Sequence, residues 1–514
     1  MSSDEGKLKG PDFARGIPLS ELTDGSMLLG HVGDDAVLLA RHGDDVFAIG
    51  ATCSHYGGPL AEGVLDGDTV RCPWHHACFS LRTGEALRAP ALSPVACWHV
   101  EQRAGQVVVT GKLERDPLAP TYPAPATRTH SVQRVVIVGA GAAGSAAAEM
   151  LRRCGFDGSL TIVDEEPDAP YDRPNLSKDF MAGSAPEEWI PLRPSGFHAE
   201  HGVALVRGRA TRLDIAARQL DVDGHASLPF DALLLSTGAD PVRLAIPGSE
   251  LPHVRYLRSL ADSRAIIAAA SGASRAVVIG ASFIGLEVAA SLRARGLDVH
   301  VVGPEAVPLE RVLGRELGAF VKALHGEKGV VFHLGRKPAR IEETAVVLDD
   351  GARLDATLVV VGVGVRPRLT LAEDAGLALD RGVAVNEFLE TSARGIYAAG
   401  DIARWPDPHS GERIRVEHWV VAQRMGQTAA RNILGAGERF EQVPFFWSAH
   451  YDVSINYVGH AETWDELRSA GSAEQRDVAV RFERLGKLRA LATIFRDGQS
   501  LHMEIDMERS LAGR

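Results

Sequence analysis

The chain has 514 residues, which predicts three or four domains at about 100–200 residues per domain. Lys and Arg total 55 against 67 for Asp and Glu, and the net charge of −12 makes nucleic acid or an anionic membrane a poor partner. A hydrophobic fraction of 45% with 24% charged residues excludes global disorder. Five cysteines exclude a disulfide scaffold and favour a reducing, cytoplasmic compartment.

The N-terminal part of the chain predicts a small all-β module. Segment 1–10 is polar and lacks the apolar core of a signal peptide, and no apolar run of about 18 residues predicts a membrane-spanning helix. Short alternating strands follow within residues 17–111, separated by Gly and Asp turns. These strands are expected at Ala36–Leu39, Val46–Ile49 and Gln106–Thr110.

Two cysteines and two histidines lie inside this module at a spacing that suits iron. Cys53 and His55 are separated by one residue, and Cys72 and His75 by two. In a Rieske [2Fe–2S] centre two thiolates hold one iron and two imidazoles hold the other. Zinc with two Cys and two His ligands is the alternative, although zinc fingers usually carry both cysteines before both histidines.

The loops around these four residues resemble Rieske cluster-binding loops. The resemblance rests on Gly57-Gly58-Pro59-Leu60 and Cys72-Pro73-Trp74-His75. High-potential Rieske proteins carry an additional cysteine in each loop, so this sequence is more similar to the ferredoxin-like, lower-potential type. His76 stands where that family usually has glycine. The other cysteines are expected to be buried thiols: Cys78, Cys97 and Cys154.

Composition and periodicity change after this module. Asp116–His130 holds four prolines and predicts a semi-rigid linker. Two similar units of strand, glycine loop and helix then begin at Arg134 and Arg275, and a looser α+β pattern begins near Phe440. The predicted domains are a Rieske domain (11–115), a linker (116–131), an FAD-binding domain (132–250 and 373–437), an NAD(P)H-binding domain (251–372) and a C-terminal domain (438–514).

The first glycine loop predicts a dinucleotide site on a Rossmann-like fold. Gly139 allows the tight turn, Gly141 lets the pyrophosphate approach the backbone, and Gly144 allows close helix–strand packing. The next strand, Leu160–Val163, ends in Asp164-Glu165-Glu166, where an acid can accept a ribose hydroxyl.

The second glycine loop is less regular, because Ser282 replaces the middle glycine between Gly280 and Gly285. After the next strand the usual acid position is Gly303, and Glu305 follows two residues later. No arginine stands immediately there to select a 2′-phosphate, so we expect NADH in preference to NADPH.

From about Gln133 onward the chain resembles FAD-dependent pyridine-nucleotide reductases, above all oxygenase-coupled ferredoxin reductases and apoptosis-inducing-factor-like proteins. With the N-terminal module included, it is similar to the Rieske-containing branch of that family. The segments that carry the resemblance are Pro170-Tyr-Asp-Arg-Pro-Asn-Leu-Ser-Lys178, Ser236-Thr237-Gly238-Ala239, Gly395-Ile-Tyr-Ala-Ala-Gly-Asp401 and Val416-Glu-His-Trp419.

This resemblance implies a role for individual residues. Glu165 would hold the adenosine ribose of FAD and Ala210 would contact adenine, while Arg173 and Lys178 would lie along the pyrophosphate and flavin. Asp401 would bond the ribityl chain or its phosphate. The segment with Trp419 would lie near the flavin pyrimidine. The full set of implied FAD-site residues is Gly139, Gly141, Ala142, Gly144, Glu165, Arg173, Lys178, Ala210, Thr237, Gly238, Asp401, Glu417, His418 and Trp419.

The same resemblance places the nicotinamide on the second fold. Glu287 would approach its amide, Gly364 would leave room beside it, and Phe446-Trp447 would cover the acceptor side of the flavin. Lys178 and Glu287 are the expected catalytic residues. The implied NAD(P)H-site residues are Gly280, Ser282, Gly285, Glu287, Glu305 and Gly364.

Three other chemistries are excluded by what the sequence lacks. No Cys-x₄-Cys dithiol lies near the first helix, no two histidines are five residues apart as in an oxygenase iron site, and no hydrolase nucleophile elbow is present. We therefore expect an electron-transfer reductase that passes electrons from NADH through FAD to a Rieske cluster or a ferredoxin-like acceptor. The alternatives are a slowly turning-over redox sensor and a Rieske module that docks an oxygenase component. A monomer or homodimer is expected.

Overall fold

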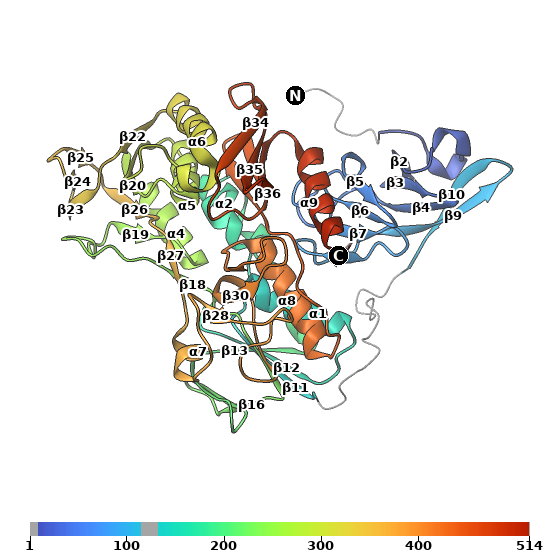
Figure 1. Cartoon of the computed structure of the whole chain (residues 1–514), viewed down its shortest axis with the longest axis horizontal. Helices are drawn as coiled ribbons and strands as arrows, with labels where there is room; N and C mark the ends of the chain where they lie inside the picture. The colour runs from blue at the N-terminus through green and yellow to red at the C-terminus, as the bar shows by residue number, and fades with distance from the viewer. Residues whose placement is uncertain (1–8, 115–131, 513–514) are drawn as a thin grey trace.

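The computed structural model describes residues 9–114 and 132–512 (Figure 1). The predicted linker, 116–131, lies outside them. Within these two ranges no helix has the length and apolar character needed to cross a membrane.

The N-terminal region forms two antiparallel sheets with no α-helix among its described residues, as the alternating pattern predicts. The larger sheet has the order β1-β10-β9-β4-β3-β2, with Ile17–Pro18 (β1), Met27–Val32 (β2), Asp35–His42 (β3), Asp45–Gly50 (β4), Cys97–Arg103 (β9) and Gln106–Lys112 (β10). The smaller sheet runs from β5 to β8, with Val64–Asp66 (β5), Thr69–Arg71 (β6), Cys78–Ser80 (β7) and Ala86–Arg88 (β8).

A parallel five-stranded sheet carries the first glycine loop. Its order is β13-β12-β11-β17-β29, with Arg134–Val138 (β11), Ser159–Asp164 (β12), Val203–Arg207 (β13), Ala232–Leu235 (β17) and Ile396–Ala398 (β29). The central strands are runs of Val, Leu and Ile because both faces of a parallel sheet are covered.

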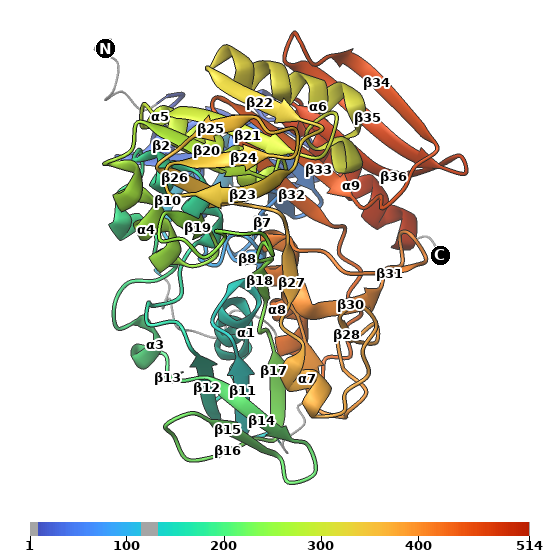
Figure 2. The same ribbon diagram turned by 90° about the vertical axis from the view of Figure 1, so that its left-hand side faces the viewer.

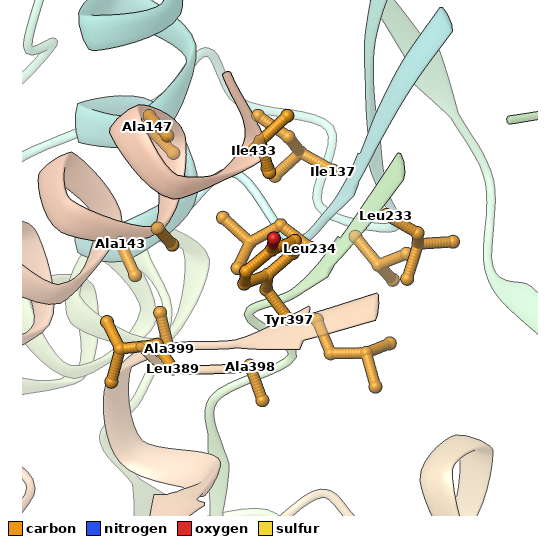
Figure 3. Close-up of a cluster of buried hydrophobic side chains, with 14 of the residues drawn as sticks. Ile137, Ala143, Ala147, Leu233, Leu234, Leu389, Tyr397, Ala398, Ala399 and Ile433 are labelled. Carbon is orange, nitrogen blue, oxygen red and sulfur yellow. The ribbon is translucent and has the colours of Figure 1, made fainter. Parts of the chain in front are cut away.

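Helices α1 (Ala142–Arg153) and α8 (Trp419–Ile433) pack against each other beside this sheet. Figure 3 shows the resulting core, in which side chains of α1, α8, the strands and the segments flanking β29 meet: Ile137, Ala143, Ala147, Leu233, Leu234, Leu389, Tyr397, Ala398, Ala399 and Ile433.

Smaller elements surround this fold. Two three-stranded sheets contain Ala210–Asp214 (β14), Gln219–Val222 (β15) and Leu228–Pro229 (β16), and Val383–Ala384 (β28), Ala403–Pro406 (β30) and Arg413–Ile414 (β31). The short helices are Asp179–Ala182 (α2), Phe197–Glu200 (α3) and Thr370–Asp374 (α7).

The second glycine loop lies on a similar parallel sheet, which Figure 2 shows above the first. Its order is β19-β26-β20-β21-β22, with Val254–Tyr256 (β19), Arg275–Ile279 (β20), Asp298–Gly303 (β21), Val330–Leu334 (β22) and Leu358–Val361 (β26). The accompanying elements are Leu260–Ala270 (α4), Phe283–Ala294 (α5), Glu310–Glu327 (α6), Pro338–Glu342 (β23), Ala345–Leu348 (β24) and Arg353–Asp355 (β25).

The chain passes between the two parallel folds at two hydrogen-bonded crossings. Strand β18 (Ala239–Pro241) leads out of the first fold, and β27 (Val365–Pro367) leads back and pairs with it antiparallel. Strand β29 then rejoins the first sheet beside β17. The first fold is therefore built from two separate stretches of sequence. The residue bounds of each domain stay a prediction.

The C-terminal region is α+β, as predicted. Its sheet has the order β32-β33-β36-β35-β34, with Phe445–His450 (β32), Val453–Gly459 (β33), Glu466–Ser472 (β34), Asp477–Arg484 (β35) and Lys487–Ile494 (β36). Helix α9 (Asp497–Ala512) follows and packs on β33 and β36 on one side and on β5 on the other. In Figure 1 this red helix lies between the C-terminal sheet and the blue N-terminal strands.

Candidate functional site

A large cavity lies where the two parallel folds and the C-terminal sheet meet. Its volume is about 1880 Å³. Pockets for one small ligand typically measure about 300–1,000 Å³, so this cavity has room for two dinucleotides. Every nucleotide-site residue predicted above lines it except Gly144 and Gly285.

These two glycines lie just behind the cavity wall, in the first turns of α1 and α5. A Cβ atom at Gly144 would lie 1.9 Å from the carbonyl oxygen of Gly139, and one at Gly285 would lie 2.1 Å from that of Gly280. Both folds therefore use glycine to bring the helix against its own loop. Gly141 is the opposite case, because a Cβ there would meet no atom within 4 Å and its backbone opens on the cavity. Both arrangements suit a bound pyrophosphate.

Replacing Gly144 with alanine is expected to weaken FAD binding by about tenfold to a hundredfold, the equivalent of an overpacking cost of about 1–3 kcal/mol. The added methyl group would displace the Gly139 carbonyl, which is backbone and cannot rotate away. The flavin content of the purified protein and its affinity in FAD titration measure this. Gly326→Ala is the control, because Gly326 lies in helix α6 and a Cβ there meets open space. Full flavin content in Gly144→Ala would contradict the expectation.

The acidic residues at the end of β12, Asp164 and Glu165, make different contacts. Asp164 Oδ2 accepts the Ala140 amide at 2.6 Å and Oδ1 accepts the Glu166 amide at 2.9 Å, so this side chain braces the glycine loop. Burial raises the pKa of Asp164. Glu165 is the more exposed neighbour, lines the cavity and forms an ion pair with Arg368. Glu165 therefore remains the predicted ribose acceptor, and the bracing role of Asp164 was missed by sequence reasoning.

Two ion pairs lie in the cavity wall. Arg173 Nη2 lies 3.0 Å from Glu166 Oε1, and Arg258 Nη2 lies 3.0 Å from Asp401 Oδ2. Ala210, at the start of β14, and Thr237 line the same wall. These contacts place the predicted FAD residues around one space, and their individual roles stay predictions. Arg258 was not predicted, and no motif singles it out.

The two predicted catalytic residues are in direct contact. Lys178 Nζ lies 2.7 Å from Glu287 Oε2, which also accepts the Ser177 hydroxyl at 2.6 Å. The second oxygen, Oε1, accepts the Ser448 hydroxyl at 2.7 Å. Glu287 is buried, and a buried carboxylate needs partners of this kind to stay charged. Sequence reasoning missed both serines, because they come from segments far from Glu287 in the chain.

In the second nucleotide site, one carboxylate oxygen has no hydrogen-bond partner among the described residues. Ser282, the residue that replaces the middle glycine, donates its hydroxyl to the Gly362 carbonyl at 3.0 Å. Glu305 lines the cavity, and its Oε2 atom is buried with no hydrogen-bond partner among the described residues. An unpaired buried carboxylate oxygen is suited to ribose hydroxyls. Gly364, with a φ of 111°, leaves open space beside this site.

The segment before α8 forms the inner wall of the cavity. Glu417 Oε1 accepts Arg415 Nη1 at 2.7 Å, and burial raises the pKa of Glu417. His418 packs on Phe446 with ring centres 4.5 Å apart, and burial lowers the pKa of His418 to about 3. Trp419 is the first residue of α8 and also lines the cavity.

The four predicted iron ligands meet between two loops. One loop follows β4 and the other joins β6 to β7. The Cys53 and Cys72 thiols form a hydrogen bond that lowers the pKa of Cys53, and the Nδ1 atoms of His55 and His75 lie 3.2 Å apart. Burial lowers the pKa of His55 to about 3, which keeps its imidazole neutral.

This pairing of like ligands fits a two-iron cluster, in which each iron takes two protein side chains. A single metal ion would need more convergent groups. Within residues 9–114 and 132–512, no set of three or more His, Cys, Asp or Glu side chains is arranged to hold one. Gly58 closes over the pair, because a Cβ there would lie 2.7 Å from Cys72 Sγ.

His76 is fully buried and joins the N-terminal module to the rest of the protein. Its φ of 61° lies in the left-handed region that glycine adopts most readily, which fits the expectation of glycine at this position. His76 Nδ1 lies 2.8 Å from Glu504 Oε2 in α9, and the ring stacks on Phe445. The carboxylate also accepts Arg424 Nη1 from α8 at 2.5 Å.

Trp447 separates the cavity from the cluster-binding loops. Its ring centre lies 4.2 Å from that of His75 and 6.3 Å from that of His55, and its side chain also lines the cavity. The Tyr56 hydroxyl donates to Asp172 at the same boundary. The imidazole side of the predicted cluster site therefore faces the predicted flavin site.

Two Rossmann-like folds around a shared cavity, with a two-Cys, two-His loop pair held against it, define a flavin- and nicotinamide-dependent electron-transfer reductase. Residues 133–426 match the model of the pyridine nucleotide-disulphide oxidoreductases, and residues 16–99 match that of the Rieske [2Fe-2S] domain. The chain belongs to the pyridine nucleotide-disulphide oxidoreductase family and carries a Rieske domain. FAD, NAD(P)H and a [2Fe–2S] cluster are its cofactors, and the predicted fold and cofactors are confirmed.

Similar proteins include apoptosis-inducing factor 3 of Homo sapiens, which is 31% identical over 89% of this chain and 77% of that protein. Rhodocoxin reductase of Rhodococcus erythropolis is 36% identical over 63% of this chain and 78% of its own length. The crystal structure of the covalent putidaredoxin reductase–putidaredoxin complex superposes with a TM-score of 0.71 and 32% identity, covering 73% of this chain and 93% of that one. The family name refers to disulfide chemistry, yet no disulfide joins the five cysteines, all of which the structure describes.

Proposed function

We propose that this protein is an NADH-dependent reductase in which the Rieske domain is the built-in acceptor of the flavin. The single observation that carries the proposal is the position of Trp447, in contact with His75 on one side and with the cavity on the other. A cluster in these loops takes its electrons across one aromatic side chain, with no separate protein required to dock.

The residues that line the cavity support this proposal, because they offer groups that would bind NADH and flavin. Flavin, when bound, accepts a hydride from NADH and passes the electrons on singly. Glu305 offers its unpaired oxygen to the ribose of NADH, and this acceptor favours NADH over NADPH. Lys178 and Glu287 provide a charged, hydrogen-bonded pair beside the site of hydride transfer. Trp447 occupies the space between the cavity and the predicted cluster-binding loops, and Phe446 lines the cavity beside it.

The proposal extends to the external acceptor, the cellular compartment and the oligomeric state. An external ferredoxin or oxygenase component would take electrons from the cluster, whose loops expose Trp74 on the protein surface. Cysteines without disulfides suit a cytoplasmic protein. The assembly is a monomer or a homodimer.

Anaerobic titration of the purified protein with NADH tests the proposal. We expect one flavin and two irons per chain, and NADH should bleach the flavin and cluster absorbances together, with NADPH requiring a higher concentration. His75→Ala should lose the cluster and retain flavin that NADH still reduces. A cluster that stays oxidised while the flavin is fully reduced would exclude the built-in acceptor.

The second candidate function is redox sensing. The match to apoptosis-inducing factor 3 spans both the Rieske and the reductase parts of this chain, and this observation favours it. A sensor would hold reduced flavin with NAD⁺ for a long time and turn over slowly, whereas a reductase would reduce ferricyanide or a ferredoxin rapidly. Steady-state turnover and the lifetime of the reduced state separate the two functions.

A further inference from the structure

A continuous chain of hydrogen-bonded side chains leads away from Glu287 on the side opposite to Lys178. It consists of Ser448, His450, His325 and Tyr451 and is called the file below. Ser448 Oγ lies 2.7 Å from Glu287 Oε1 and 3.2 Å from His450 Nε2. His450 Nδ1 lies 3.2 Å from His325 Nε2, and His325 Nδ1 lies 3.4 Å from the Tyr451 hydroxyl. The file crosses from β32 into helix α6 and returns to the residue after β32.

Only one arrangement of hydrogens satisfies this file while Glu287 is ionised. A carboxylate only accepts, so the Ser448 hydroxyl donates to Glu287 and its oxygen accepts from His450 Nε2. A neutral imidazole has one donor and one acceptor, so His450 Nδ1 accepts from His325 Nε2. His325 Nδ1 in turn accepts the Tyr451 hydroxyl. Every hydrogen in the file therefore points toward Glu287.

The inner part of the file is sealed from water. Ser448, His450 and His325 are buried, and burial lowers the pKa of His450 to about 3 and that of His325 to about 2, so both rings are neutral. The positive charge of Lys178 lowers the pKa of His450 further. Three buried polar side chains in one file, none of them touching the predicted cofactor space, call for a function beyond filling the core.

The outer end reaches the surface. Tyr451 is half-buried, and Lys328, an exposed residue at the end of α6, lies over its ring at 5.8 Å. Burial raises the pKa of Tyr451 to about 12, although nearby Arg293 opposes this. The hydroxyl is therefore protonated and can donate its hydrogen to His325 Nδ1.

We propose that Tyr451, His325, His450 and Ser448 form a proton path that joins the buried Glu287 carboxylate to solvent. The proposal rests on the function proposed above and extends it, because it gives the cavity a route for protons separate from the route for electrons. The four residues act through Glu287 and are positioning residues for proton transfer.

The path balances the charge of hydride transfer. Hydride transfer from NADH would add one negative charge to a flavin held in the cavity that Glu287 lines. The proposed path would answer that charge by delivering one proton to the Glu287 carboxylate. The Ser448 proton moves to Glu287 Oε1, and each following proton moves one place inward: His450 Nε2 to Ser448, His325 Nε2 to His450 Nδ1, and the Tyr451 hydroxyl to His325 Nδ1. Tyr451 then takes one proton from water.

When two electrons have left, the same path runs outward. Glu287 returns its proton, and the hydrogen that came as hydride leaves as a second proton. The net reaction per NADH is one NAD⁺, two reduced one-electron acceptors and one proton, so atoms and charges balance. Without protonation of Glu287, reoxidation would release only one proton per flavin.

The first test counts protons on reoxidation. Fully photoreduced holoenzyme is mixed anaerobically with ferricyanide, an acceptor that takes no proton, in weak buffer with a pH indicator. We expect close to two protons per flavin from the wild type and one from Glu287→Gln. In His325→Phe one of the two protons should appear more slowly, by roughly tenfold to a hundredfold for a lost proton-transfer group. A single proton from the wild type, or two equally fast protons from His325→Phe, would overturn the proposal.

A matched control is present in the same domain. His333 Nε2 lies 2.9 Å from His300 Nδ1 in β21, and this stacked pair has no link to Glu287 in the described residues. His333→Phe should release protons like the wild type. Tyr451→Phe removes only a hydroxyl at the outer end and should also slow release, so the test does not depend on a buried substitution. Repeating the count in His75→Ala, which is expected to lack the cluster, makes the result independent of whether the Rieske domain is the built-in acceptor.

The second test needs no turnover. ¹⁵N-histidine NMR of the oxidised holoenzyme, assigned with His325→Phe and His450→Phe, reports which ring nitrogen carries hydrogen. Both rings should be neutral at pH 7 with the hydrogen on Nε2. Hydrogen on Nδ1 of either ring, or a charged ring, would break the file and overturn the path.

Discussion

Replacing Trp447 with leucine is expected to slow the arrival of electrons at the Rieske cluster, relative to reduction of the flavin by NADH, by about tenfold or more, equal to about 1.4 kcal/mol of activation free energy. The indole contacts His75 at 4.2 Å between ring centres and lines the cavity on its other side. Leucine would fill only part of this space and would let water between the two cofactor sites.

Anaerobic stopped-flow mixing with NADH measures this, because flavin and cluster bleaching are followed in one trace and their ratio removes any effect on NADH binding. Trp447→Phe keeps an aromatic ring and should recover part of the rate. Trp189→Leu is the control, since Trp189 is 70% exposed in the reductase part of the chain and touches neither site. An unchanged ratio in Trp447→Leu would remove Trp447 from the electron route.

Replacing Glu504 with glutamine is expected to lower the free energy of unfolding by about 3–5 kcal/mol, the usual cost of leaving one partner of a buried ion pair unpaired. Glu504 Oε1 accepts Arg424 Nη1 at 2.5 Å and Oε2 lies 2.8 Å from His76 Nδ1, and none of these side chains is more than 1% exposed. The variant leaves the Arg424 charge buried at the point where α8, α9 and the Rieske domain meet.

The pH dependence of this contribution has a definite sign. Burial opposes ionisation of Glu504, but the charge of Arg424 and the hydrogen bond from His76 outweigh it and hold the pKa of Glu504 well below its ordinary 4.5. A depressed pKa in the folded state means that the contribution is complete above pH 4.5 and is lost as the pH falls from there toward the folded-state pKa. The stability of the wild type should therefore fall more steeply below pH 4.5 than that of Glu504→Gln.

Urea unfolding of both proteins from pH 7 down to about pH 3, followed by circular dichroism, measures the two effects. Glu466→Gln is the control, because Glu466 forms an exposed pair with Arg468 at 2.8 Å in the same C-terminal sheet, where solvent weakens such pairs. The control should remain close to the wild type at every pH. Equal stability of Glu504→Gln and the wild type would show that the Rieske domain is held by other contacts.

Much of the nucleotide site could be predicted because its signals are local. The turn at Gly139 and the helix that follows are neighbours in sequence, so their spacing reports the phosphate loop directly. The same holds for Cys53 with His55 and for Cys72 with His75, since each pair sits in one short loop. Partners from distant segments have no such signal. Ser448 meets Glu287 across 161 positions, and His325 meets His450 across 125.

The sequence by itself determined the classes of module in this protein, their order and their cofactors, because each of these depends on short motifs and on local periodicity. The His76 position shows the limit of such reasoning. In the sequence, His76 is only a residue that replaces the expected glycine after the predicted ligand His75. In the structure, His76 of the Rieske domain contacts Glu504 of α9, and Glu504 in turn binds Arg424 of α8. Tertiary structure alone decided that the predicted cluster-binding loops face Trp447 and that hydrogen bonds connect Glu287 to Tyr451. Both depend on which surfaces pack together, and packing is set by shape and charge summed over the whole chain.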